Sequence, residues 1–181
     1  MIEGVYRTRS GYSGGSLKDP TYQNLGDHTE TIQIDFDPEL ISYKEILALF
    51  WNSHNPATSS WSAQYKAVIF YHNDEQKQAA LQSKEELERK QQITVATEIL
   101  PFQEFYMAED YHQKYYLQGR HLLMSDMRSY YPDFIDIIHS TAAARLNGFI
   151  AGHGTADMLM KEIDSFGLTA EARKDLMKTV N

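Results

Sequence analysis

The sequence of 181 residues contains no cysteine. This absence excludes disulfide bonds, thiolate metal sites and any mechanism in which a cysteine of these residues is the nucleophile. The sequence also lacks an apolar run of the roughly 18 residues that a membrane span requires, and residues 1–15 contain no hydrophobic region of a secretory signal. We therefore expect a cytoplasmic protein that has no membrane partner.

Basic residues are scarce relative to acidic ones. The chain has 17 Lys and Arg against 25 Asp and Glu, which gives a formal net charge of −8. A surface with this balance repels polyanions, so we expect no nucleic-acid partner. The hydrophobic share of 42% and the charged share of 23% are typical of a compact globular protein. The length corresponds to one domain with a small terminal extension.

The chain up to residue 117 alternates between predicted strands and predicted helices. Residues 4–30 are rich in Gly, Ser, Asn and Asp and predict a long structured loop. Apolar patterning predicts strands over residues 31–36, 65–71 and 93–99, of which the second should be central and the first should bury Ile32, Ile34 and Phe36. A capping box of Ser42 and Glu45 predicts a helix over residues 42–52, and Asn73 as a cap predicts a helix over residues 73–90. This order indicates an α/β fold.

From about Arg120 onward the pattern is helical only. A short helix is predicted before it, over residues 108–117. Ser140 or Thr141, Thr155 and Thr169 are the expected N-caps of three further helices. We therefore predict an α/β domain over residues 1–119 and a helical C-terminal extension over residues 120–181 that packs on it.

Two Glu/Asp-x-x-His pairs have the spacing of half a carboxylate-bridged metal site. They are Glu109 with His112 and Asp136 with His139. A complete site of this kind needs acidic partners on two further helices, and the strand-rich middle of the chain offers none. We therefore interpret these pairs as surface or capping residues and expect no metal.

Five residues of or near the glycine-rich segment form a candidate chemical site: Tyr12, Tyr22, His28, Glu30 and Tyr65. A glutamic acid flanked by phenols in a partly dry pocket has a raised pKa and can donate a proton near neutral pH. The alternative is that these side chains only bond to the loop backbone. No serine nucleophile or catalytic triad is visible in the sequence.

A series of ordered motifs covers residues 4–117. The motifs are GVYRTRSGYSGG at 4–15, DPTY at 19–22, GDHTE at 26–30, FDP at 36–38, FWNSHNP at 50–56, QY at 64–65 and YMAEDYHQ at 106–113. In this order they resemble peptide methionine sulfoxide reductase A. From Arg120 onward only a weaker similarity remains, to a tail of some longer members.

The resemblance implies a two-layer, ferredoxin-like α+β core and an activity. The family reduces the S epimer of methionine sulfoxide, free or in peptides, to methionine and so repairs oxidised proteins. No metal or organic cofactor is implied. A cysteine thiolate in a G-C-F-W motif attacks the sulfoxide sulfur, and thioredoxin or a small thiol then regenerates the cysteine.

The family's supporting residues carry over to three positions of this sequence. The glutamate that protonates the departing oxygen corresponds to Glu30, and the two tyrosines that hold this oxygen correspond to Tyr22 and Tyr65. Trp61, next to Ser60 where members often have Asp, is either part of an aromatic wall for the substrate or a surface residue. Together with Tyr12 and His28 it completes the expected substrate-binding set.

The sequence departs from the family in one essential respect. The G-C-F-W motif and the first core strand belong upstream of Gly4 and are absent from these residues. Because Glu30 and the tyrosines cannot supply two electrons, we expect the chain as written to be inactive, with a sheet edge or an apolar face left open. Three hypotheses remain: a longer, thioredoxin-dependent reductase; a non-catalytic module that binds methionine sulfoxide or a partner; and a decayed remnant.

Overall fold

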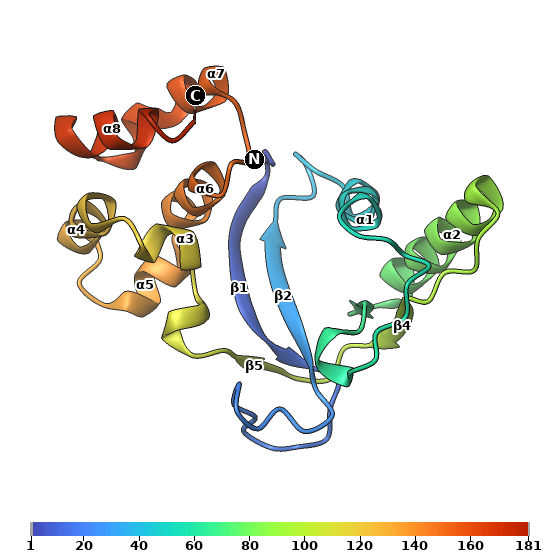
Figure 1. Ribbon diagram of the computed structural model, residues 1–181. Coiled ribbons are helices and arrows are strands. Elements are labelled where there is room, and N and C mark those ends of the chain that lie inside the picture. The colour runs from blue at the N-terminus through green and yellow to red at the C-terminus, as the bar shows by residue number, and fades with distance from the viewer. Residues whose placement is uncertain (1, 181) are drawn as a thin grey trace. The chain divides into compact units, whose positions relative to one another are not determined.

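The computed structural model describes residues 2–180, and these form two compact units whose elements are labelled in Figure 1. The α/β unit comprises residues 10–32 and 37–108, and the helical unit comprises residues 2–9, 33–36 and 109–180. These bounds differ from the expected division into residues 1–119 and 120–181. That division remains a prediction about how the chain is organised.

Three strands form one sheet in the order β2-β1-β5. They are β1 (Val5–Ser13), β2 (Thr29–Phe36) and β5 (Phe105–Met107), and β5 runs antiparallel to β1 with Tyr12 opposite Tyr106. The predicted loop over residues 4–30 is therefore wrong for residues 5–13. The β1 sequence is polar, and its pairing partners on both sides, which hydrophobic periodicity does not reveal, keep it extended.

Ion pairs with β2 account for some of the polar residues of β1. In the helical unit, Arg7 Nε lies 2.8 Å from Asp35 Oδ2, and Arg9 Nη2 lies 2.8 Å from Asp35 Oδ1. Arg9 Nε also donates to Gln33 Oε1 at 2.9 Å. The predicted strand at residues 31–36 is confirmed within β2, but Ile32 is 61% exposed, so the expected buried face does not hold at this residue.

A strand–helix–strand unit makes up the second sheet of the α/β unit. Strand β3 (Val68–Tyr71) and strand β4 (Glu98–Pro101) pair in parallel and are connected through helix α2 (Asp74–Gln91). Parallel neighbours require such a crossover. The predicted helices are confirmed: α1 (Tyr43–Asn52) begins with the expected Ser42–Glu45 capping box, and Asn73 caps α2.

Two strand predictions in this unit were wrong in part: one in the place of the strand in the sheet and in its start, the other in its start alone. Among the described residues β3 pairs only with β4, so β3 is not central. A short 3₁₀ helix (Ala63–Tyr65) replaces its predicted beginning. Strand β4 starts at Glu98, not at Ile93, and Ile93 and Val95 instead pack into the core formed with Leu47 and Trp51 of α1.

From residue 109 onward the helical unit is a succession of short helices. They are a 3₁₀ turn (Asp110–His112), α3 (Tyr115–Gln118), α4 (His121–Tyr130), α5 (Phe134–His139), α6 (Thr141–Ile150), α7 (Ala156–Glu162), a second 3₁₀ turn (Ile163–Phe166) and α8 (Ala170–Met177). The expected helices beyond Arg120 are thus confirmed. The single helix predicted over residues 108–117 is interrupted at Lys114, whose φ is 49°.

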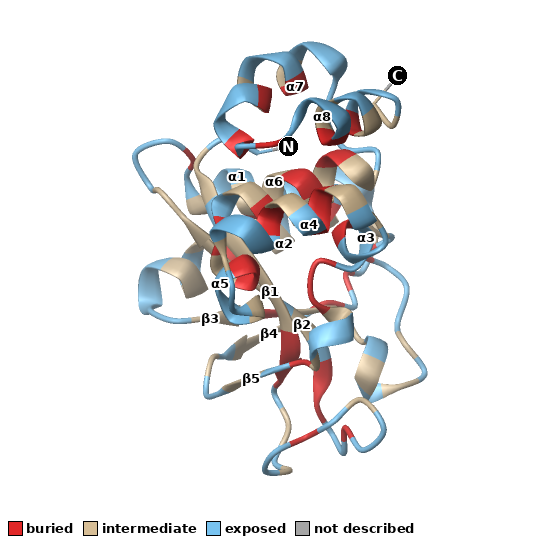
Figure 2. Cartoon of the chain, turned by 90° about the vertical axis from the view of Figure 1, so that its left-hand side faces the viewer, coloured by how far each residue is buried: buried red, intermediate tan, exposed pale blue. Residues whose placement is uncertain are grey.

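The caps and the core explain why these helices form. Ser140, Thr155 and Thr169 accept backbone hydrogen bonds at the starts of α6, α7 and α8, as the sequence predicted. Buried positions recur along the helices in Figure 2, and Leu146 and Phe149 of α6 are fully buried. No helix within residues 2–180 is both long and apolar enough to cross a bilayer.

Candidate functional site

The candidate site lies in the α/β unit and begins with Glu30 on β2. Gln64 Nε2 donates a hydrogen bond of 2.7 Å to Glu30 Oε1. Glu30 is exposed to solvent, so its carboxyl group is not enclosed in the dry pocket considered from the sequence. The amide fixes one carboxyl oxygen and leaves the other oxygen available to a ligand.

Local hydrogen bonds explain why Gln64 faces Glu30. The Thr29 hydroxyl shares its single proton between the carbonyl oxygens of Gln64 and Lys66, each at 3.1 Å, and so connects the start of β2 to the 3₁₀ helix. Ser62 Oγ accepts from Gln64 N at 3.2 Å and caps that helix. These bonds place residues 64 and 65, which are distant from β2 in sequence, next to Glu30.

The two tyrosines of the candidate set are joined to each other. A hydrogen bond with Tyr22 is the largest cause that raises the pKa of Tyr65; the Coulombic effect of Tyr22, partial burial and the charge of Glu30 raise it further. The raised pKa keeps the Tyr65 phenol protonated. Tyr22 sits in a turn in which Thr21 and Asn24 bond reciprocally through their backbones at 3.2 and 2.9 Å.

Trp61 extends this group on the solvent side. Its ring centroid lies 6.5 Å from that of Tyr65 at an interplanar angle of 59°. Its side chain is 92% exposed, which is unusual for tryptophan, because burying an indole is normally favourable. An uncovered indole beside a phenol is a surface that can contact an apolar group of a ligand.

Tyr12 and His28 occupy different surroundings. Tyr12 is 2% exposed and forms a small core with Leu25 and Ala108, against which Tyr22 packs. His28 is 1% exposed; its Nδ1 accepts from Gly15 N at 3.2 Å and its Nε2 lies 2.8 Å from Leu17 O. Both buried side chains therefore stabilise the segment that connects β1 to β2. Their contact with a substrate, expected from the sequence, remains a prediction.

The structure therefore brings Glu30, Tyr22 and Tyr65 together, with Trp61 beside them. Gln64 was not singled out from the sequence, although it directly precedes Tyr65. Together these groups offer one carboxyl, two phenols and an amide around an exposed surface, an arrangement that binds and can protonate a polar oxygen. Within residues 2–180 no three potential metal-ligating side chains cluster.

Comparison with known proteins shows to which family the chain is similar. The sequence model of the family described as "Peptide methionine sulfoxide reductase" matches residues 1–132. The chain belongs to this family. The match covers every residue of the candidate site and extends into the helical unit.

Individual members of the peptide methionine sulfoxide reductase family are also similar to this chain in sequence. The peptide methionine sulfoxide reductase of Drosophila melanogaster is 46% identical over 173 residues, which cover 94% of this chain and 69% of that protein. The enzyme MsrA of Methanosarcina mazei is 48% identical over 141 residues, covering 72% of this chain and 66% of the relative. The chain thus spans about two thirds of the length of these relatives, and the Drosophila match includes most of the C-terminal helices.

Solved structures of the family share the fold. Reduced Mxr1 from Saccharomyces cerevisiae is 28% identical with a TM-score of 0.59, covering 62% of this chain and 71% of that chain. Methionine sulfoxide reductase A of Corynebacterium diphtheriae is 26% identical with a TM-score of 0.55 and covers 66% of each chain. These likenesses confirm the expected mixed α/β fold of the methionine sulfoxide reductase family.

Proposed function

We propose that this chain binds the sulfoxide group of methionine sulfoxide at the site of Glu30, Tyr22 and Tyr65. The observation that carries the proposal is the convergence of these three side chains, which are separated by up to 43 positions in the chain, in a member of the methionine sulfoxide reductase family. The ligand is the S epimer of methionine sulfoxide, free or within a peptide.

The sulfoxide oxygen is a strong hydrogen-bond acceptor that carries partial negative charge. The hydroxyl groups of Tyr22 and Tyr65 are suitable donors, and the raised pKa of Tyr65 keeps its phenol protonated at neutral pH. A ligand seated against the exposed ring of Trp61 would also cover Glu30 and exclude water from it. Glu30 would then deliver a proton as the oxygen leaves as water.

Reduction of the sulfoxide needs two electrons that these side chains do not hold. Converting a sulfoxide into a thioether and water consumes two protons and two electrons. In the family the two electrons come from a cysteine thiolate, which is oxidised to a sulfenic acid and later regenerated by thioredoxin or a small thiol. The 181 residues contain no cysteine. We therefore propose that they supply binding and proton donation for protein repair but do not complete the reaction by themselves.

Titration calorimetry of the 181-residue chain with a peptide containing methionine-S-sulfoxide tests the binding. We expect heat of binding, weaker binding of the unoxidised peptide, and about tenfold weaker sulfoxide binding for Glu30→Gln, because an amide N–H is a weaker donor to the sulfoxide oxygen than the O–H of a carboxylic acid. Glu39→Gln, at another exposed position of the same unit, is the matched control. No heat for the wild-type chain, or the same affinity for Glu30→Gln, contradicts the proposal.

A second measurement separates binding from turnover. With excess dithiothreitol as reductant, we expect no conversion of methionine sulfoxide by the 181-residue chain beyond the rate without protein. The reason is that removing the nucleophile from a set of catalytic residues that act together lowers the catalytic rate about as much as removing the whole set. Methionine formed in proportion to protein concentration would show that another group attacks the sulfur.

A further inference from the structure

His28 is a buried histidine whose two ring nitrogens both have partners. It is 1% exposed, Gly15 N donates to its Nδ1 at 3.2 Å, and its Nε2 lies 2.8 Å from the carbonyl oxygen of Leu17. A backbone N–H can only donate and a carbonyl oxygen can only accept, so Nδ1 must be the acceptor and Nε2 must carry the proton. These contacts therefore select one neutral tautomer of His28.

His28 joins the two ends of the loop of residues 14–28, which connects β1 to β2. Its two ring bonds reach the beginning of this loop. A third bond runs from Ser16 N to Asp27 Oδ1 at 2.8 Å, but Asp27 is exposed, so water can replace that bond. Compact loops whose ends lie close together are held by such contacts of their own side chains. His28 therefore supplies the part of the closure that water does not replace.

The backbone at Gly15 approaches the imidazole ring so closely that no side chain fits there. A Cβ atom on Gly15 would lie 2.5 Å from His28 Cδ2, a separation too short for two carbon atoms that are not bonded. Gly15, unlike the neighbouring Gly14, does not have a positive φ, so its backbone conformation does not require glycine. The ring of His28 is thus the reason that residue 15 lacks a side chain.

The loop of residues 14–28 carries Tyr22 of the candidate site. His28 N donates to Leu25 O at 3.2 Å, which extends the closure toward the middle of the loop. Leu25 is buried with Tyr12, and Tyr22 packs against this small core. From this position Tyr22 forms its hydrogen bond with Tyr65. The closed loop therefore determines where the Tyr22 phenol lies.

Protonation of His28 is incompatible with this closure. A protonated imidazole has two N–H donors and no acceptor, so its Nδ1–H would point at the N–H of Gly15. The ring is buried, and water therefore has little access to the donors that lose their partner. The loop must open for both groups to be solvated.

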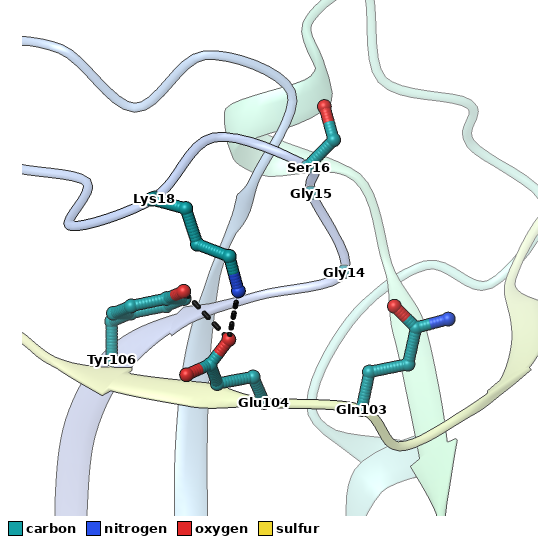
Figure 3. Close-up of a pocket in the computed structure, with 7 residues that line it drawn as sticks. All are labelled: Gly14, Gly15, Ser16, Lys18, Gln103, Glu104 and Tyr106. Carbon is teal, nitrogen blue, oxygen red and sulfur yellow. Dashed lines mark hydrogen bonds and ion pairs between the residues drawn. The ribbon is translucent and has the colours of Figure 1, made fainter.

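The charged groups around His28 stabilise a protonated ring only weakly. Glu104 Oε2 is already bound by Lys18 Nζ at 3.0 Å and by the Tyr106 hydroxyl at 2.6 Å (Figure 3). Bonds from Tyr106 and Lys18 are the main causes that lower the pKa of Glu104, and the charge of the histidine contributes least. The Tyr106 ring, edge-on to His28 with centroids 5.4 Å apart, carries no charge. Asp27 is exposed, so solvent screens its carboxylate.

We propose that His28 is a pH-sensitive positioning residue. In its neutral form it closes the loop of residues 14–28 and holds Tyr22 beside Tyr65; in its protonated form it opens the loop and weakens the binding of methionine sulfoxide. Histidine is the side chain that ordinarily changes its charge between about pH 5 and 8. The effect on binding rests on the proposed function, whereas the opening of the loop does not.

NMR spectra of the 181-residue chain without ligand test the opening of the loop. At about pH 7.5 the ring signals of His28 should show the Nε2–H tautomer, and on acidification to about pH 5.5 the amide signals of Gly15 and Tyr22 should shift as the ring gains its proton. In His28→Asn the side-chain oxygen replaces Nδ1 as the acceptor and takes up no proton in this range, so these amide signals should stay in place.

Titration calorimetry with a peptide containing methionine-S-sulfoxide tests the effect on binding. At about pH 7.5 we expect His28→Asn to bind within about threefold of the wild type, and on acidification to about pH 5.5 the affinity of the wild type should fall about tenfold relative to this variant. Protonation of Glu30 affects both proteins equally and cancels in this ratio. His72→Asn replaces an exposed histidine of the same unit and should keep the pH dependence of the wild type.

The outcomes separate this inference from the proposed function. A Gly15 amide signal that stays in place while His28 of the wild type gains its proton overturns the inference, even if His28→Asn does not fold. A ratio of wild-type to His28→Asn affinity that is the same at both pH values also overturns it and leaves the sulfoxide site intact. If the wild type binds no sulfoxide at either pH, the proposed function fails, and the spectra still decide whether His28 opens the loop.

Discussion

Lys114 is the buried cation of the helical unit. It is 5% exposed, its Nζ donates to Thr8 O at 2.5 Å, and its backbone adopts the left-handed conformation that interrupts the helix expected over residues 108–117. Burial, and to a smaller extent the charge of Arg9, lowers its pKa from 10.5 to about 8. The protein therefore contains an amine that loses its proton more readily when folded than when unfolded.

This lowered pKa predicts a dependence of stability on pH. Between pH 8 and 10.5 the unfolded chain holds a proton on Lys114 that the folded chain has released. Because the unfolded state then binds more protons, the free energy of unfolding rises with pH across this window, by an amount on the order of 3 kcal/mol. Below about pH 8 both states are protonated, and the cost of burying the charge is fully present.

Urea unfolding of the wild type and of Lys114→Met across this pH window measures the effect. The difference between the two curves isolates Lys114 from the tyrosines that titrate in the same range. We expect the rise with pH to disappear in Lys114→Met. Lys44→Met, at an exposed position of α1, should keep it. Parallel curves for the wild type and Lys114→Met would show that the amine is solvated in the folded protein.

The residues of the candidate site illustrate what a sequence can and cannot supply. Glu30, Tyr22 and Tyr65 were selected from their residue types in or near a glycine-rich segment and from the family motifs. Gln64 was not selected, since an amide becomes a partner of Glu30 only after Thr29 and Ser62 have fixed the 3₁₀ helix beside β2. The exposure of Glu30 was also not predicted, because solvent access depends on packing between segments distant in sequence.

At the scale of elements, predictions were accurate where local chemistry determines the structure. The helices α1, α2, α6, α7 and α8 begin at the N-caps identified from the sequence, because a cap needs only residues three positions apart. Strands β1 and β5 were not predicted. Their pairing joins residues more than 90 positions apart, with Gly11 opposite Met107, and no local pattern encodes it.

The cap of α6 gives an element-scale prediction. Ser140 Oγ accepts from Ala143 N at 3.0 Å and donates to Ile137 O at 3.1 Å, and the residue is 8% exposed. Ser140→Ala leaves both backbone groups without this partner where water has little access. We expect it to lower the free energy of unfolding by about 1–2 kcal/mol.

Thr155→Ala at the start of α7 is the matched comparison for this cap. Thr155 Oγ1 accepts from Met158 N at 3.2 Å, but the residue is exposed, so water can replace the lost bond. We expect a loss of only about 0.5 kcal/mol. Unfolding midpoints in urea that fall equally for the two variants would show that burial does not determine the strength of the Ser140 cap.

At the scale of the whole molecule, charge distribution decides which partners are repelled. The excess of acidic residues gives a net charge of −8. Several basic side chains are already paired with carboxylates: Arg7, Arg9, Lys18, Lys66, Arg120, Arg145 and Arg173. A cation held by a carboxylate gains little from a phosphate, because the negative charge of the carboxylate offsets the attraction between the cation and the phosphate.

This distribution predicts that the chain does not bind nucleic acid. In a gel-shift assay at about 50 mM salt, where phosphate contacts are still strong, micromolar protein should leave a DNA duplex unshifted. Lowering the salt further makes the test more demanding, because screening of any residual attraction then decreases. A shift that weakens steeply as salt is added would reveal a cluster of unpaired cations and would contradict the expectation drawn from net charge. A shift independent of salt would instead point to contacts with the bases.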